Sequence, residues 1–103
     1  MNTYKRRKKR RFAEKITPAQ QELFDDLCQV YGKLGITVRV ETGRFRGGYC
    51  LVEGEPFFFL NKHQTMEQKI ELLLSQLKNF NTEKIFLSPR IREYITNKPW
   101  GNS

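Results

Sequence analysis

The sequence predicts a single α+β domain that follows a basic N-terminal arm. Two segments begin with helix-capping residues and carry apolar side chains at helical spacing, and three short strand-like segments lie between them. The chain has 103 residues, close to the usual size of one domain. We expect a disordered basic arm over residues 1–15, the domain over 16–96 and a flexible C-terminal tail over 97–103.

The first helix is expected to begin at Thr17-Pro18-Ala19-Gln20. Thr17 can cap it, proline suits the first helical position, and Gln20 completes a capping box. Apolar side chains then recur on one face, at Leu23, Phe24, Leu27, Cys28, Val30, Tyr31 and Leu34. Gly35 is expected to end the helix in a left-handed conformation.

Three strands are expected next. Residues 36–41 alternate, which places Ile36, Val38 and Val40 inward, and residues 49–52 form a second short strand. Residues 53–56 have turn chemistry, and residues 57–60 form a third strand that is apolar on both faces. The short connections predict a three-stranded antiparallel meander. Its third strand is either covered on both faces or exposed on one as a platform.

Two helices complete the domain, in the order α-β-β-β-α-α. Residues 65–68 form a second capping box, and Asn79 and Asn81 close the central helix. Its inner stripe comprises Ile70, Leu73, Leu74, Leu77 and Phe80. Leu72 lies on the other side of this helix, which indicates enclosure on more than one face. Ser88-Pro89 begins a short third helix.

The positive charge is concentrated at the N-terminus. The net charge is +8, of which residues 1–15 contribute +7 and the remainder +1. The basic residues of the arm are Lys5, Arg6, Arg7, Lys8, Lys9, Arg10, Arg11 and Lys15. Such a run repels itself and buries nothing, so we expect it to be disordered when free. It either binds phosphate backbones through counterion release, or acts as a solubilising tail or as a tail that binds anionic surfaces without selection.

Composition bears on the location of the protein. No segment approaches the roughly 18 apolar residues that span a bilayer, and no apolar signal segment follows the basic start. Two cysteines do not form a disulfide framework. We therefore expect a reduced, cytoplasmic protein without a membrane span.

The residues that carry most enzyme chemistry are sparse. His63 is the only histidine, it lies in a polar loop, and no serine or cysteine is placed beside it. Cys28 and Cys50 are expected to pack in the core, and their spacing with His63 resembles no zinc finger. The carboxylates at Asp25, Asp26, Glu53 and Glu55 are expected to be solvated. We expect no catalytic residue, cofactor or metal.

The loop Arg44-Phe45-Arg46-Gly47-Gly48 is a candidate binding element. Two arginines around an aromatic ring can hold a phosphate or stack on a base. The alternative is a flexible hairpin loop with Phe45 on the core. Phe57, Phe58 and Phe59 can likewise stack bases, although a buried central strand also explains them.

The first helix is followed by strands that end in Leu60-Asn61, by a short loop and by a helix that Thr65 caps. This order of elements resembles the minimal core of zincin-type metallopeptidases. In that family an edge strand ends near an Ile-Asn pair, and the next helix carries the HExxH zinc motif. The motif would fall near residues 74–78, but the helix over 65–80 contains no histidine. The resemblance, over residues 17–95, implies a scaffold without zinc or peptidase activity. The chain also resembles small bacterial proteins of this size.

The leading hypothesis is a non-enzymatic protein that binds nucleic acid, preferably RNA, through the arm, with support from Arg44 and Arg46. The alternative is a protein-interaction or homodimerisation module on an inactive zincin-like scaffold. That module would use Leu72, residues 57–59 or Trp100. A small enzyme is the third class, but no pair of residues suggests an acid and a base.

Overall fold

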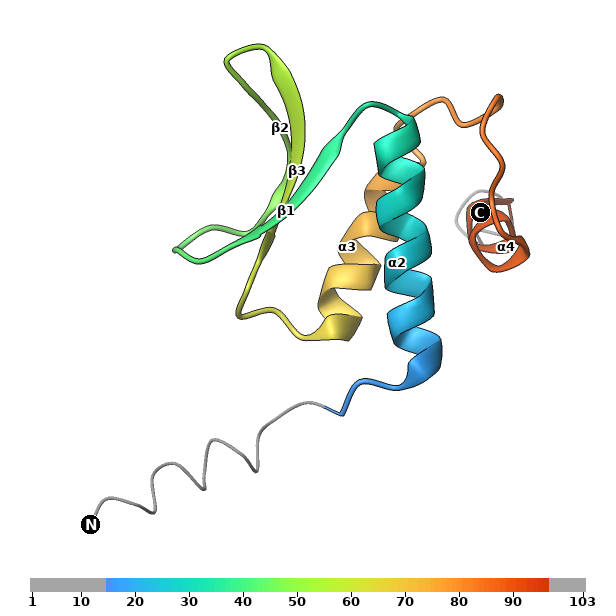
Figure 1. Cartoon of the computed structure of the whole chain (residues 1–103), viewed down its shortest axis with the longest axis horizontal. Helices are drawn as coiled ribbons and strands as arrows, with labels where there is room; N and C mark the ends of the chain where they lie inside the picture. The colour runs from blue at the N-terminus through green and yellow to red at the C-terminus, as the bar shows by residue number, and fades with distance from the viewer. Residues whose placement is uncertain (1–14, 97–103) are drawn as a thin grey trace, which may run out of the picture.

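The computed structural model describes residues 15–96 (Figure 1). The elements are α2 (Pro18–Lys33), β1 (Thr37–Glu41), β2 (Gly48–Val52), β3 (Glu55–Asn61), α3 (Met66–Leu77) and α4 (Pro89–Thr96). The α+β class and the order of elements are therefore confirmed. The predicted arm, apart from Lys15, and the predicted tail lie outside the described residues.

Both predicted capping boxes are present. The Gln20 backbone N–H donates to Thr17 Oγ1, and the Thr17 N–H donates to Gln20 Oε1, each at 3.1 Å. Thr65 and Gln68 repeat this exchange at 2.9 and 3.0 Å. These bonds satisfy backbone donors that have no partner within a helix, so each helix begins where the sequence predicts.

The C-terminal end of α2 agrees with the prediction, and that of α3 differs from it slightly. Gly35 follows α2 with a φ of 83°, the left-handed conformation predicted for it. Helix α3 ends at Leu77 rather than near Asn79–Asn81. The chain tightens beyond it, because the N–H groups of Asn79 and Phe80 each bond to the carbonyl three residues earlier.

The prediction of an antiparallel meander is wrong. The sheet is mixed, in the order β1-β3-β2, with β1 parallel and β2 antiparallel to β3. A meander would place β2 in the middle. The physical reason lies in β3, which is apolar on both faces and buries more side chain in the central position than β2 would. The connection from β1 to β2 therefore passes the C-terminal end of β3.

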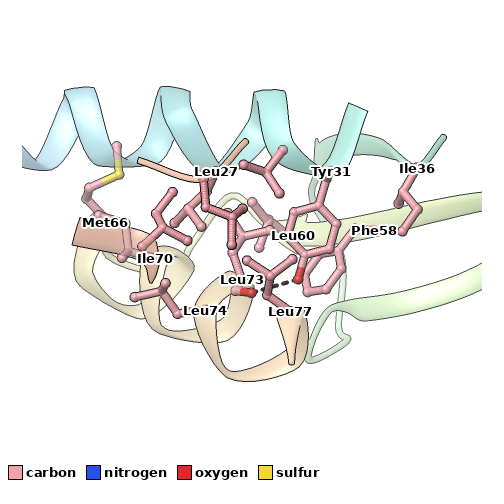
Figure 2. Packing of buried hydrophobic residues seen from close by; sticks show 13 residues of the cluster. Leu27, Tyr31, Ile36, Phe58, Leu60, Met66, Ile70, Leu73, Leu74 and Leu77 are labelled. Atoms are coloured by element: carbon pink, nitrogen blue, oxygen red, sulfur yellow. Dashed lines mark hydrogen bonds between the residues drawn. The ribbon is translucent and has the colours of Figure 1, made fainter. Parts of the chain in front are cut away.

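The core lies between the sheet and the helices, which occupy one side of the sheet (Figure 1). Phe58 and Leu60 of β3 are fully buried there. Figure 2 shows Tyr31 of α2 beside Phe58 and Leu73, and the Tyr31 and Phe58 ring centroids are 4.9 Å apart. The buried hydrophobic cluster is Leu27, Val30, Tyr31, Ile36, Phe58, Leu60, Met66, Ile70, Leu73, Leu74, Leu77, Leu87 and Ile91.

The opposite face of the sheet carries Phe57 and Phe59, since side chains alternate along a strand. Their rings stack at 5.4 Å with an interplanar angle of 17°, and both side chains are partly exposed. The helices described here lie on the other side (Figure 1). The third strand is thus covered on one face and open on the other. Val40 lies on the helix side beside Leu60, as expected, but it is 46% exposed because β1 runs away from α2.

Candidate nucleic-acid interface

The connection between β1 and β2, residues 42–47, is called the crossover loop here. It presents Arg44 and Arg46 to solvent, with Phe45 between them at 38% exposure. Arg44 and Arg46 are the predicted site residues that lie within residues 15–96, and both belong to this loop. The other predicted site residues, Lys5, Arg6, Arg7, Lys8, Lys9, Arg10 and Arg11, lie outside the described residues.

Asn61, at the end of β3, holds the crossover loop in place. Its Nδ2 donates to the backbone carbonyls of Gly43 and Phe45 at 2.8 and 2.9 Å. Its Oδ1 accepts from the His63 N–H at 3.0 Å. The side chain therefore uses both its donor and its acceptor group, as expected for a polar residue that is only 7% exposed.

Gln64 adds two hydrogen bonds that also hold the crossover loop. Its Oε1 accepts from the Asn61 N–H at 2.9 Å, and its Nε2 donates to the Arg46 carbonyl at 3.4 Å. These bonds engage the backbone of the loop and leave the guanidinium groups of Arg44 and Arg46 exposed. The loop can thus present two cations and a ring on a fixed backbone.

Gly47 brings the crossover loop against β3. Its φ is 90°, and a Cβ added there would lie 2.6 Å from the Phe59 carbonyl oxygen and 3.4 Å from a Leu72 methyl carbon. A residue with a side chain would push the loop away from the strand. The glycines expected to make a flexible hairpin loop therefore allow close packing at the end of β3.

A hollow of about 480 Å³ opens beside the loop, and we call it the sheet hollow. Phe45, Arg46 and Phe59 line it, together with Glu41 and residues 47–50. Its walls are mostly apolar, and they carry one cation, Arg46, and one carboxylate, Glu41, which is paired with Arg39. Such walls suit the face of an aromatic base better than a free phosphate.

A second hollow, of about 790 Å³, lies between the loop and α3. Glu67 and Glu71 line it, along with Phe45, Arg46, His63 and several amide side chains. Two carboxylates against one guanidinium disfavour a phosphate or any other anion. The sheet hollow is therefore the better candidate for contact with nucleic acid.

The remaining singled-out residues do not join this site. Cys28 is half-buried on α2, and burial, reinforced by the nearby Asp25 carboxylate, raises its pKa to about 11. Cys50 was expected in the core, but it is exposed on β2. His63 is also exposed, and its N–H is used by Asn61. Trp100 lies outside the described residues.

Two further findings concern residues 15–96. No group of three or more His, Cys, Asp or Glu side chains in this part of the chain is arranged to hold a metal ion. No helix within it combines the length and apolar character needed to cross a membrane.

Asn61 was not predicted to anchor the site. It stood out only as part of the Leu60-Asn61 pair. A polar residue that ends an apolar strand is a weak signal, and nothing local shows that its amide reaches a loop 16 to 18 residues earlier.

Comparison of the chain with protein-family models, with curated proteins and with solved structures finds no match. The resemblance to the zincin core stays a prediction.

Proposed function

We propose that this chain is a non-enzymatic binding protein that contacts nucleic acid, with single-stranded RNA as the preferred class. One observation carries the proposal. Arg44, Phe45 and Arg46 stand exposed on a loop whose backbone is hydrogen-bonded to Asn61, beside a hollow lined by Phe59.

The chemistry of this surface suits unpaired nucleotides. Guanidinium groups bind phosphate oxygens through two donors at once, and aromatic rings stack on bases. Stacking requires a base that is free of its neighbours, so a loop or single strand fits better than a duplex. Arg39 is left out of the interface, because its guanidinium pairs with Glu41 at 2.8 Å.

The basic arm would supply most of the affinity. Its net charge of +7 allows release of counterions from the phosphate backbone. In this proposal the arm provides affinity without base selection, and the crossover loop orients the strand. The protein would act in the cytoplasm, where its two cysteines stay reduced.

The proposal is tested by titrating a labelled single-stranded RNA of mixed sequence at several salt concentrations. One full-length variant carries Gln at residues 5–11, and another combines Arg44→Ala with Arg46→Ala. The control combines Lys84→Ala with Arg92→Ala, which removes the same charge from exposed positions outside the crossover loop.

We expect a steep loss of wild-type affinity with salt. Each lost phosphate contact reduces the slope of log K against log salt by about 0.7. The loop variant should lower the slope by about 1.4, the arm variant by more, and the control by less than either. Equal affinity of the wild type and the arm variant would show that the proposal is wrong. Stronger binding of duplex DNA than of RNA would contradict the preference for single strands.

The surfaces named for a protein-interaction module receive less support. Leu72 is partly buried and lies close enough to Gly47 to contact a Cβ added there. Phe57 and Phe59 face the open side of the sheet, where base stacking also explains them.

A further inference from the structure

Strand β2 is an edge strand with an apolar, uncharged surface. Only β3 pairs with it in the described sheet. Tyr49, Leu51 and Val52 are 41%, 60% and 42% exposed, and residues 48–52 carry no charge. Exposed edges of this kind usually carry charged residues or proline, because they otherwise pair with another strand. The opposite edge, β1, does carry charges at Arg39 and Glu41.

The hairpin geometry shows which backbone groups of β2 face outward. Glu53 and Gly54 connect β2 to β3 with φ values of 53° and 85°, as in a two-residue type I′ turn. The flanking pair Val52–Glu55 then exchanges hydrogen bonds, and alternate pairs do so along the ladder. Leu51 lies opposite Pro56, which has no N–H to donate. The backbone groups of Tyr49 and Leu51 therefore point away from β3.

We propose that β2 pairs antiparallel with β2 of a second copy of this chain, about a two-fold axis between their Cys50 residues. Tyr49 then exchanges backbone hydrogen bonds with the partner's Leu51, and Leu51 with the partner's Tyr49. The register uses the whole of the strand and joins the two sheets into one of six strands. This inference does not rest on the proposed binding of nucleic acid, although Arg46 and Cys50 belong to both surfaces.

Charge complementarity favours a second copy as the occupant of this edge. In this register the start of each strand, which Arg46 precedes, lies beside the end of the partner's strand, where the partner's Glu53 and the partner's Glu55 flank the turn. The symmetry brings a basic end beside an acidic end twice. A parallel arrangement would instead bring the acidic ends of the two strands together, which is unfavourable.

The apolar side chains also match across the axis. Directly opposite residues of an antiparallel pair lie on one face of the sheet, so Tyr49 and the partner's Leu51 meet. They lie on the helix side, where the Tyr49 ring is 5.3 Å from that of Phe80. Pairing would cover Leu51, the most exposed apolar side chain of the strand.

The first experiment measures the mass of the protein in solution for two charged variants, Cys50→Lys and Cys50→Glu. Like charges directly opposite each other destabilise a strand pair, so each variant alone should be monomeric. A mixture of the two should form a dimer, because the charges then attract. The control is Val40→Lys, which adds the same charge as Cys50→Lys at an exposed residue on the other edge.

We expect the wild type and the Val40→Lys variant to remain dimeric in about 0.5 M salt, where exposed charges are screened. A monomeric wild type at high protein concentration would overturn the proposal. Dimers of Cys50→Lys alone would show that another surface is used. Circular dichroism checks that each variant is folded.

A second experiment tests the register by disulfide formation. Residues at a non-hydrogen-bonded antiparallel position have Cα atoms about 4.5 Å apart, within the range that a disulfide spans. In a Cys28→Ala variant, the oxidant diamide should take up the two thiol hydrogens and leave a disulfide between the two Cys50 residues. Rapid formation of covalent dimers is the expected result. A non-covalent dimer that fails to cross-link would overturn the proposed axis.

Discussion

The Tyr31 hydroxyl donates a hydrogen bond of 2.6 Å to the backbone carbonyl of Leu73. This bond joins α2 to α3 at the centre of the core, and both residues are fully buried. The Tyr31 ring also lies 4.9 Å from the Phe58 ring and 5.9 Å from that of Phe80. One side chain thus connects two helices, the central strand and the turn after α3.

Removing this hydroxyl should destabilise the fold without abolishing it. Tyr31→Phe keeps the ring contacts and loses one buried hydrogen bond, which costs about 0.5–1.5 kcal/mol. Tyr31→Ala also leaves a cavity, with a cost of about 3–5 kcal/mol. Denaturant unfolding measures both. Equal losses for the two variants would contradict a main contribution from the ring.

Replacing Asn61 by Asp should release the crossover loop. The carboxylate keeps an acceptor for the His63 N–H, but it places negative oxygens against the carbonyls of Gly43 and Phe45. Loss of two partly buried bonds should cost about 2–3 kcal/mol. Hydrogen exchange should become faster over residues 43–46. The control is Asn81→Asp, which is exposed and keeps the acceptor oxygen for Glu83.

Replacing glycine by alanine should change the stability of the protein in opposite directions at two positions. Gly32 lies within α2 with open space around it, so Gly32→Ala should stabilise the protein by about 0.5–1 kcal/mol. Gly47 has a φ of 90° and no room beside the Phe59 carbonyl, so Gly47→Ala should destabilise it by about 2 kcal/mol or more. Thermal unfolding gives both signs. A neutral Gly47→Ala would show that the loop moves away at little cost.

The two cysteines should differ in reactivity. The pKa of the Cys28 thiol is about 11, two units above its ordinary value of 9.0, which lowers its thiolate fraction at neutral pH about 100-fold. Cys50 is exposed. Brief treatment of dilute protein with a maleimide should therefore label Cys50 first, as read by mass spectrometry of peptides. Preferential labelling of Cys28 would contradict its environment.

Stability should fall as the pH rises from about 9 to about 11. Over this window the Cys28 thiol keeps its proton in the folded protein and loses it in the unfolded chain, which favours unfolding. Below pH 9 both states are protonated, so the full contribution is present. Burial also raises the pKa of Tyr31, which acts in the same direction. Urea midpoints across this window should decline less in Cys28→Ala than in the wild type.

The helices were predictable because their signals are local. Thr17 with Gln20, and Thr65 with Gln68, are three residues apart and bond as the sequence indicates. The strands were also found to within two residues or so. Their order was not, because strand pairing is a long-range property. Residues 57–60, apolar on both faces, carried the relevant signal, since a strand of this kind gains most from a central position.

The candidate site was predictable in part. Arg44 and Arg46 were predicted from the local sequence of their loop, and their exposure was predictable because charged side chains are mostly exposed. Their anchoring was not, because the amide of Asn61 acts across a fold that local pattern does not reveal. The exposed edge of β2 was also missed, since a short apolar segment looks the same in the centre of a sheet and at its edge.

The position of β3 between β1 and β2 imposes an order of assembly. Strands β2 and β3 are joined by two residues and can pair within microseconds as a hairpin. Thr37 of β1 pairs with Phe57, twenty residues later, and a longer loop must close first. We expect the hairpin to form early and β1 to dock on its free side. The last step is then the formation of hydrogen bonds between the Asn61 side-chain amide and the crossover loop, which passes the end of β3.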